Sequence, residues 1–286
     1  MTNDSHFIVI FTDLDGTLLD HISYGWEDAK PALNLCKRLH VPVVPVSSKT
    51  GAEIDVIRRK LGLTSPFISE NGGGIFFPAG GDHRPPSGTI IAGDIWKWPL
   101  GLSYDFLVRA FREIRNELGW KLRGFSEMTP EEISHLTGLD PKTSLLASER
   151  EYDEPFIVLE QDTPDVNALH AAARRRGLNI TTGGRFYHLQ GRIDKGEAVR
   201  KVISWYQEDH PQLVSIALGD SPNDFSMLKQ VNYPVLVRAS HQFPGIEDAI
   251  PGISITREMG PKGWNTAVLD LLRNKIVTTQ SIGDSP

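Results

Sequence analysis

The sequence is short of cysteine, of long apolar runs and of positive charge, and each shortage excludes a class of protein. Cys36 is the only cysteine among 286 residues, so no disulfide can form within the chain, and its apolar position in an expected helix predicts a core residue. No apolar stretch is long enough to span a membrane, and the first six residues lack the features of a signal peptide. The net charge of −6 disfavours a broad nucleic-acid-binding surface. These absences predict a cytoplasmic protein that binds neither nucleic acid nor membrane.

The sequence also lacks the Gly-x-x-x-x-Gly-Lys-Ser/Thr pattern, which disfavours a P-loop kinase. The remaining composition, 40% hydrophobic and 23% charged, is ordinary for a globular protein. The length predicts one large domain or two of medium size. The negative net charge still permits a locally basic cleft that binds a small anion.

The most informative stretch is an apolar run, residues 8–11, that ends in two carboxylates one residue apart. A buried parallel strand is a continuous apolar run, and its carboxyl end is where open α/β sheets bind ligands. Asp13 and Asp15 are therefore predicted to lie at the mouth of a site. Two acids this close repel each other unless a cation or donors hold them, and Mg²⁺ prefers oxygen ligands of this kind. Gly16 allows a sharp turn after the acids, and Thr17 adds a hydroxyl.

Four further polar residues follow apolar strands or begin a helix. Ser47 follows an expected strand, Asp220 and Asp224 follow the buried strand 214–218, and Lys195 begins a helix. Each has an ordinary structural interpretation: Ser47 as a helix cap, Lys195 as a solvated lysine, and the acids as part of a strand–turn–helix junction. Their occurrence in this order along one chain favours a shared site at one edge of a parallel sheet.

The pattern of expected elements predicts an α/β protein with a Rossmann-like parallel-sheet core and an inserted α+β domain. The core takes residues 1–83 and 191–286, where strands and helices alternate. The inserted domain takes residues 84–190, where helices mix with hairpin-like strands.

Several local predictions can be compared with the structure. The strand at 67–69 is expected to continue the parallel pattern, and residues 78–93, rich in glycine and proline, are expected to form a linker or hinge. A helix is expected at 104–118, and Thr129 with Glu three residues on is a strong helix start. Residues 278–286 are polar and are expected to be a disordered tail.

The chemistry that this set of residues supports is phosphoryl transfer, which needs a nucleophile, a proton donor and positive charge around the phosphate oxygens. Asp13 can attack phosphorus and form an aspartyl-phosphate, and Asp15 can act as general acid and then base. Lys195 and Mg²⁺ can supply positive charge, and Ser47 can donate its hydroxyl to the phosphate.

Asp13-Leu14-Asp15-Gly16-Thr17-Leu18, Ser47, Lys195 and Gly219-Asp220-Ser221-Pro222-Asn223-Asp224 together resemble the four motifs of the haloacid dehalogenase (HAD) superfamily, over nearly the whole chain. The resemblance implies that Asp13 is the nucleophile and Asp15 the acid/base. It also implies that Ser47 and Lys195 hold the phosphate. The implied Mg²⁺ site comprises Asp13, Asp15, Asp220 and Asp224. The insertion resembles the cap of the Cof-type branch, whose usual Thr-Gly-Arg and Gly-Asp-Gly-x-Asn-Asp motifs are altered here.

The altered motifs narrow the match to the mannosyl-3-phosphoglycerate phosphatase family. The similarity covers Ser47-Ser48-Lys49-Thr50, Glu70-Asn71-Gly72-Gly73-Gly74, Gly184-Arg185-Phe186-Tyr187-His188-Leu189 and Gly260-Pro261-Lys262-Gly263-Trp264-Asn265. It implies Mg²⁺-dependent removal of phosphate from a small glycosyl phosphoglycerate, giving mannosylglycerate or glucosylglycerate, which are compatible solutes. The substrate-binding residues it implies are Ser48, Lys49, Glu70, Asn71, Gly72, Gly73, Arg185, His188, Asn223 and Lys262.

Two alternatives stay open at this point. The first is a Cof-type phosphatase that acts on other sugar phosphates or on nucleotide-derived phosphates. The second is a non-catalytic HAD-like binding module, which is disfavoured because Asp13, Asp15, Lys195 and Asp220 are all present. On the strand that carries Arg185 and His188, a spacing of three residues places the two side chains on opposite faces, so that one of the two is expected to be structural. The sequence does not indicate mannosyl against glucosyl specificity or the oligomeric state.

Overall fold

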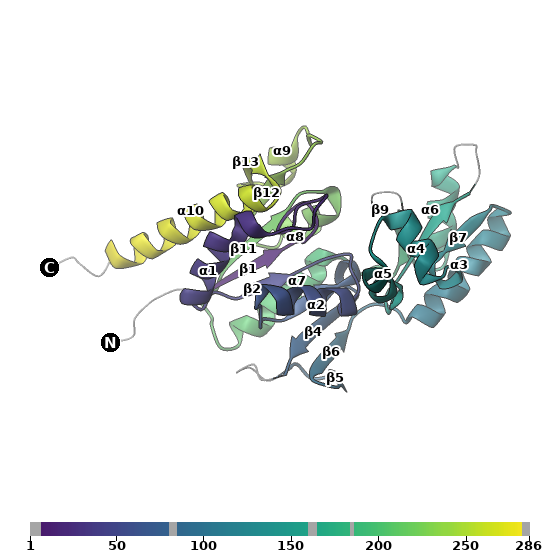
Figure 1. Ribbon diagram of the computed structural model, residues 1–286, viewed down its shortest axis with the longest axis horizontal. Helices are drawn as coiled ribbons and strands as arrows, with labels where there is room; N and C mark the ends of the chain where they lie inside the picture. Colours follow the sequence, from purple (N-terminus) through teal and green to yellow (C-terminus); the bar gives the residue numbers. More distant parts are fainter. Residues whose placement is uncertain (1–6, 80–84, 160–164, 184–185, 282–286) are drawn as a thin grey trace. The chain divides into compact units, whose positions relative to one another are not determined.

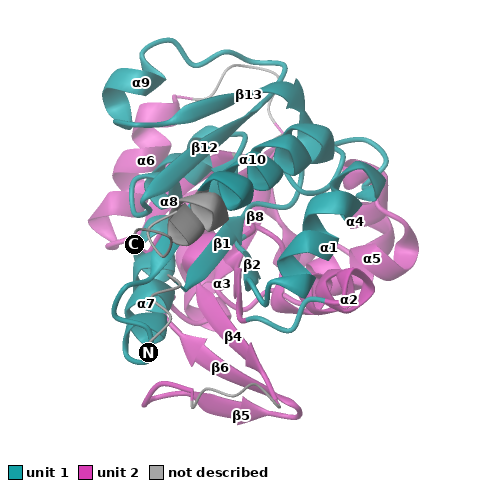
Figure 2. Ribbon diagram, turned by 90° about the vertical axis from the view of Figure 1, so that its left-hand side faces the viewer, with its two compact units in different colours: residues 1–46, 63–65, 195–286 teal, residues 47–62, 66–194 magenta. Residues whose placement is uncertain are grey.

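The structure, a computed structural model, describes residues 7–79, 85–159, 165–183 and 186–281. The chain has an α/β fold with a parallel-sheet core and an inserted α+β cap, and it divides into two compact units (Figure 2). Unit 1 comprises residues 1–46, 63–65 and 195–286, and unit 2 comprises residues 47–62 and 66–194. In the part of the chain that the structure describes, no helix has the length and apolar character needed to cross a membrane.

Unit 1 contains a five-stranded parallel sheet in the order β13-β12-β11-β1-β2 (Figure 1). Its strands are β1 (Ile8–Thr12), β2 (Val43–Pro45), β11 (Val214–Gly219), β12 (Tyr233–Arg238) and β13 (Ser254–Met259). Its helices are η1 (Glu27–Ala29), α1 (Lys30–Arg38), α7 (Lys195–Gln207), η4 (Pro222–Asp224), α8 (Phe225–Leu228), α9 (Ile246–Ala249) and α10 (Gly260–Ser281). Helices α1 and α10 pack against each other, and α7 packs against α8.

Strand β1 lies at the centre of this sheet because its residues are apolar on both faces. Val9, Ile10 and Phe11 are fully buried, as expected for a parallel strand covered on both sides. Strand β2 lies at the edge of the sheet, and there Pro45 removes no hydrogen bond that an inner strand would need. Cys36 is buried on α1, which confirms the prediction of a core cysteine, and burial raises the pKa of its thiol to about 12.

Unit 2 contains two four-stranded antiparallel sheets, β7-β8-β10-β9 and β3-β4-β6-β5. The first consists of β7 (Leu122–Gly124), β8 (Asp153–Val158), β9 (Asn179–Gly183) and β10 (Phe186–Gln190), and the second of β3 (Phe67–Ser69), β4 (Gly74–Pro78), β5 (Ile90–Ala92) and β6 (Ile95–Pro99). The helices are α2 (Gly51–Leu61), η2 (Glu70–Gly72), α3 (Tyr104–Leu118), η3 (Phe125–Glu127), α4 (Pro130–Thr137), α5 (Pro141–Ser148) and α6 (Val166–Arg175). Helices α3 and α6 pack on the first sheet around a core that includes Phe111, Phe156 and Leu169.

Helix predictions based on local signals are confirmed. Helix α3 covers 104–118, and Thr129 with Glu132 forms the expected capping box at the start of α4. Helix α2 likewise begins with a capping box, formed by Thr50 and Glu53, and ends at Gly62, whose φ of +68° is left-handed.

Three other predictions are wrong. Strand β3 does not continue the parallel pattern, because it pairs antiparallel with β4. The segment 78–93 is not simply a linker, because it contains β5, which pairs with β6; residues 80–84 lie outside the described residues. Helix α10 continues to Ser281, so 278–281 are helical rather than a disordered tail, and 282–286 again lie outside the described residues. Strand β13 was not predicted at all.

Candidate active site

The carboxylate of Asp13 lies directly after the central strand of unit 1. Its backbone N–H donates to Leu218 O of β11 at 2.9 Å, and the carbonyl of the preceding Thr12 accepts from Val46 N at 2.8 Å. These two hydrogen bonds continue the ladders on both sides of β1, so the end of the strand is held from both neighbours. Asp13 is 6% exposed. The structure therefore places this acid at the carboxyl end of the parallel sheet, as predicted.

Lys195 meets Asp13 from the first residue of α7. Its ammonium Nζ donates to Asp13 Oδ1 and to Asp224 Oδ1, both at 2.6 Å. The lysine side chain is 1% exposed, and its charge is paired with the two carboxylates. Burial by itself lowers the pKa of Lys195, but Asp13 and Asp224 raise it overall, so the ammonium stays charged. The structure thus brings Lys195 together with Asp13 and Asp224, and the lysine is not a solvated one.

Asp224 organises the turn after β11. Its Oδ2 accepts from the backbone N–H groups of Asp220 and Ser221, both at 3.1 Å, and from the Ser221 hydroxyl at 3.0 Å. The Thr17 hydroxyl donates to Asp220 Oδ1 at 3.2 Å. Gly16 is required beside this turn, because its φ is +78° and a Cβ there would come within 2.5 Å of Asp220 Oδ2. Burial, and then the charge of Asp224, raise the pKa of Asp220 to about 6.

Asp13, Asp220 and Asp224 form an acidic cluster in which one oxygen of each lies within 4.8 Å of the others. Three carboxylates against one lysine leave an excess of negative charge, and buried carboxylate oxygens are donors that suit a hard divalent cation. The residues present therefore fit Mg²⁺. Asp15, which is also predicted to bind the metal, is not among these three, and its assignment to the metal stays a prediction.

The end of β1 is also tied to α10, a contact that the sequence did not indicate. Trp264, which is fully buried, donates from Nε1 to the Thr12 hydroxyl at 3.0 Å, and this hydroxyl donates to Asp13 O at 2.7 Å. These two hydrogen bonds link Trp264, which is 252 positions from Thr12 in the sequence, to the peptide group of Asp13. The resemblance motif contains Trp264, but no local pattern connects it with Thr12. Lys262, predicted to bind substrate, is exposed near the start of the same helix, and Asn223 lies half-buried in the turn after β11.

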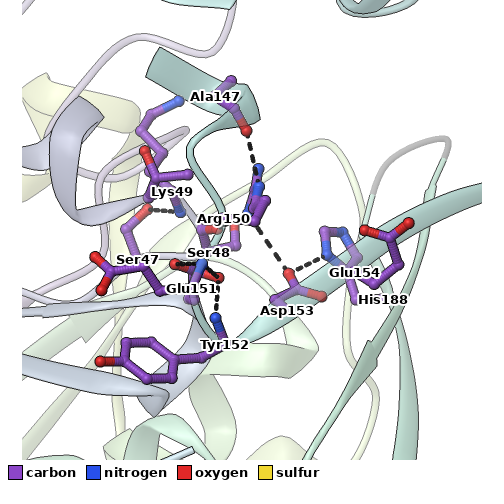
Figure 3. Close-up of polar contacts among 12 residues, drawn as sticks. Ser47, Ser48, Lys49, Ala147, Arg150, Glu151, Tyr152, Asp153, Glu154 and His188 are labelled. Carbon is purple, nitrogen blue, oxygen red and sulfur yellow. Dashed lines mark hydrogen bonds and ion pairs between the residues drawn. The ribbon is translucent and has the colours of Figure 1, made fainter. Parts of the chain in front are cut away.

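In unit 2, the predicted phosphate-binding segment Ser47–Lys49 lies beside η2. Ser47 N donates to Ile68 O and Ser47 O accepts from Asn71 N, both at 3.0 Å. Lys49 N donates to the Ser47 hydroxyl at 3.3 Å (Figure 3). Ser47 is 1% exposed and Lys49 is 8% exposed. The segment is thus fixed through its backbone by the turn that follows β3.

The turn itself is strained, because Glu70 and Asn71 have φ values of +47° and +55°. The Glu70 carboxylate accepts from Tyr152 N at 2.8 Å and from Glu151 N at 3.1 Å, so this predicted substrate-binding side chain is engaged with the backbone. Gly73 permits close packing here, since a Cβ would lie 2.2 Å from that of Tyr152. Burial raises the pKa of Glu70 to about 8.

His188 lies on β10 with 8% of its surface exposed, and its Nδ1 is 2.7 Å from Asp153 Oδ2 (Figure 3). Arg185, the other predicted cap residue, lies outside the described residues. The roles of both in substrate binding stay predictions.

Comparisons with known proteins agree with this geometry. The family model for haloacid dehalogenase-like hydrolases matches residues 10–82 and 160–242. A glucosyl-3-phosphoglycerate/mannosyl-3-phosphoglycerate phosphatase from Methanococcoides burtonii is 40% identical, covering 92% of this chain and 97% of its own. A mannosyl-3-phosphoglycerate phosphatase from Pyrococcus horikoshii is 34% identical, and the match covers 80% of this chain and 90% of the relative. The solved structure of Thermoplasma acidophilum 0175 shares the fold, with a TM-score of 0.64 at 19% identity, covering 93% and 98%.

The chain belongs to the haloacid dehalogenase-like hydrolase family. The resemblance drawn from the four motifs is thereby confirmed, and so is the narrower likeness to the phosphoglycerate phosphatases.

Proposed function

We propose that this protein is a Mg²⁺-dependent phosphatase that hydrolyses mannosyl-3-phosphoglycerate or glucosyl-3-phosphoglycerate to the glycosylglycerate and phosphate. The observation that carries the proposal is the similarity, over nearly the whole chain, to relatives named for these two substrates. The buried Asp13–Lys195–Asp224 arrangement supports it, because a carboxylate nucleophile requires a fixed cation beside it. Residues 84–190 are proposed as the cap, and a cytoplasmic location also remains a proposal.

The reaction divides into two steps at Asp13. Its carboxylate attacks phosphorus and forms an aspartyl-phosphate, while Asp15 gives a proton to the departing glycerate oxygen. Asp15 then takes a proton from water, whose oxygen attacks the aspartyl-phosphate and releases phosphate. Lys195 holds Asp13 in place and offsets negative charge throughout. Strand β1 and Thr12 keep the Asp13 backbone fixed through both steps.

The metal would be held by Asp13, Asp220 and Asp224, with Asp15 as a further proposed ligand. When bound, Mg²⁺ supplies positive charge that offsets the phosphate dianion and lowers its repulsion of the nucleophile. Ser47 is proposed to bind the phosphate, as the family resemblance implies. Ser48, Lys49, Asn71, Gly72, Arg185, His188, Asn223 and Lys262 are proposed to bind the rest of the substrate on the same ground. Glu70 and Gly73 are proposed to act by shaping the turn beside them.

A panel of substrates tests this function. Phosphate release is measured with Mg²⁺ on mannosyl- and glucosyl-3-phosphoglycerate, 3-phosphoglycerate and free hexose phosphates. We expect kcat/KM for a glycosyl phosphoglycerate to exceed that for hexose phosphates by at least about 10-fold, the size of one charged hydrogen bond. Asp13→Asn should abolish turnover, Asp15→Asn should lose about 10²- to 10⁴-fold, and chelation should stop the reaction until Mg²⁺ is restored. Hexose phosphates as the best substrates would establish the Cof-type alternative instead.

A further inference from the structure

Unit 2 contains a row of three buried ionisable side chains, Arg150, Asp153 and His188, of which only His188 has been given a role in the proposed function. Arg150 Nη1 lies 3.5 Å from Asp153 Oδ2, and the same oxygen lies 2.7 Å from His188 Nδ1 (Figure 3). The side chains are 7%, 0% and 10% exposed in that order. Charges buried this deeply are costly unless each is paired, so their arrangement calls for a reason beyond general stability.

Arg150 uses its planar group to connect three segments of unit 2. Its Nε donates to Ala147 O at the end of α5, and its Nη1 donates to Ser48 O, each at 2.9 Å. Ser48 belongs to the segment that is proposed to bind phosphate and substrate. The third contact is the carboxylate of Asp153 at the start of β8. Only a guanidinium offers several donors in one fixed plane, so lysine could not replace these contacts.

The segment that carries Arg150 is itself held in place by the side chain of Glu70. Glu70 accepts from the backbone N–H groups of Glu151 and Tyr152, which directly follow Arg150. Burial lowers the pKa of Arg150, but Asp153 and Glu70 raise it overall, so the guanidinium is charged. Arg150 therefore provides a fixed positive charge beside Asp153.

Asp153 in turn determines how His188 presents its ring. The 2.7 Å contact between His188 Nδ1 and Asp153 Oδ2, with Arg150 on the same carboxylate oxygen, favours the tautomer in which Nδ1 carries the proton and donates it to Asp153. This holds the ring orientation and leaves Nε2 as the atom that can meet a ligand. Strands β8 and β10 fix the distance, because Pro155 pairs with His188 and Gln190 pairs with Asp153 in the antiparallel register.

We propose that Arg150 and Asp153 are positioning residues for substrate recognition: Asp153 fixes the tautomer and orientation of His188, and Arg150 holds Asp153 and the Ser47–Lys49 segment in one arrangement. His188 Nε2 then meets the glycerate or sugar part of the substrate. This inference rests on the proposed function for its choice of substrate. The hydrogen-bonding arrangement itself does not depend on that choice.

The first test needs no substrate, and its main result is read from the wild-type protein. Nitrogen-15 NMR of the intact protein, with His188 assigned by comparison with His188→Gln, reads which ring nitrogen is protonated when the imidazole is neutral. We expect the Nδ1–H form, whereas the Nε2–H form would overturn the proposal. In Asp153→Asn, the side-chain amide can donate to Nδ1, and we expect the population to move toward Nε2–H.

The second test is kinetic. Asp153→Asn should raise KM for the glycosyl phosphoglycerate about 10-fold or more, with a smaller change in kcat, because a contact remote from phosphorus is lost equally in the ground and transition states. Hydrolysis of an aryl phosphate, which lacks the glycerate and sugar, should change less than 3-fold, about 0.6 kcal/mol. Glu151→Gln is the matched control, because it removes a carboxylate two positions away that pairs with Lys97 and does not contact His188. This control should match the wild type on both substrates.

A double variant separates positioning from a general structural role. If Asp153 acts through His188, Asp153→Asn combined with His188→Gln should be no slower than His188→Gln alone. Fully additive losses, or equal losses on both substrates, would overturn the proposal. A wild-type enzyme that does not hydrolyse glycosyl phosphoglycerates would refute the proposed function, and the NMR result would still decide whether Asp153 orients His188.

Discussion

Replacing Lys195 with methionine provides a direct test of the charge balance in unit 1. The change removes the ammonium that donates at 2.6 Å to both Asp13 and Asp224, and it keeps an unbranched chain of similar volume. Asp224 is fully buried, and 9% of the Asp13 side chain is exposed. The variant therefore leaves three neighbouring carboxylates without their lysine, and little solvent to replace it.

The expected loss follows from these contacts. Each charged hydrogen bond contributes about 1.5 to 3 kcal/mol, and breaking one partner of a buried ion pair costs about 3 to 5 kcal/mol in all. We expect Lys195→Met to lower the free energy of unfolding of unit 1 by about 3 to 5 kcal/mol when metal is absent. Mg²⁺ at 100 times its dissociation constant should add about 2.7 kcal/mol to the free energy of unfolding of unit 1. The gain in stability should be larger in the variant, where the carboxylates lack another cation.

Hydrogen exchange read by mass spectrometry is the appropriate assay, because a chain of two units need not unfold in one transition. The most protected peptides from β1 and β11 report on unit 1 alone. Exchange is followed in EDTA and in Mg²⁺ for the wild type, Lys195→Met and Arg200→Met, an exposed control on the same helix. If Lys195→Met lowers the free energy of unfolding in EDTA by less than about 1 kcal/mol, or by no more than Arg200→Met does, the inferred role of Lys195 is refuted.

Three further predictions concern other parts of the chain. Burial raises the pKa of Glu70 from 4.5 to about 8, so between these pH values the folded state binds more protons than the unfolded state. The free energy of unfolding should therefore fall as pH rises, by at most about 1.4 kcal/mol per pH unit. Glu70→Gln should flatten this dependence in denaturation curves measured from pH 5 to 8. Trp264→Phe removes the donor to the Thr12 hydroxyl and should destabilise unit 1 by about 1 to 3 kcal/mol in the exchange assay, and no change would show that this hydrogen bond contributes nothing. Arg185→Ala should weaken transition-state binding of the glycosyl phosphoglycerate by about 2 to 3 kcal/mol, measured as the fall in kcat/KM, and should barely affect hydrolysis of an aryl phosphate. Equal losses of kcat/KM on both substrates would assign Arg185 a structural role.

Local signals were sufficient for many elements of this protein. The apolar run before Asp13 predicts a buried parallel strand, and β1 is the central strand of the sheet. The ends of α2 and α4 follow from their capping boxes and from the glycines after them. These predictions succeed because a cap or an apolar face depends on residues within one or two turns of each other.

Two other features of the fold were not predictable in this way. The turn between β3 and β4 depends on positive φ values at Glu70 and Asn71, which nothing in their side chains demands. Strand β13 lies at the edge of its sheet with four of its six residues exposed, so its apolar pattern is weak. Both features are stabilised by contacts that exist only after the chain has folded.

The sequence by itself determined the family, the acids and lysine of the candidate site, and the order in which they appear. Only the tertiary structure decided which of them touch: Lys195 with Asp13 and Asp224, Trp264 with Thr12, and Arg150 with Ser48. The physical reason is that short-range preferences act through neighbours in the chain, whereas a buried charge is stable only where packing brings an opposite charge or a donor to it from a distant segment.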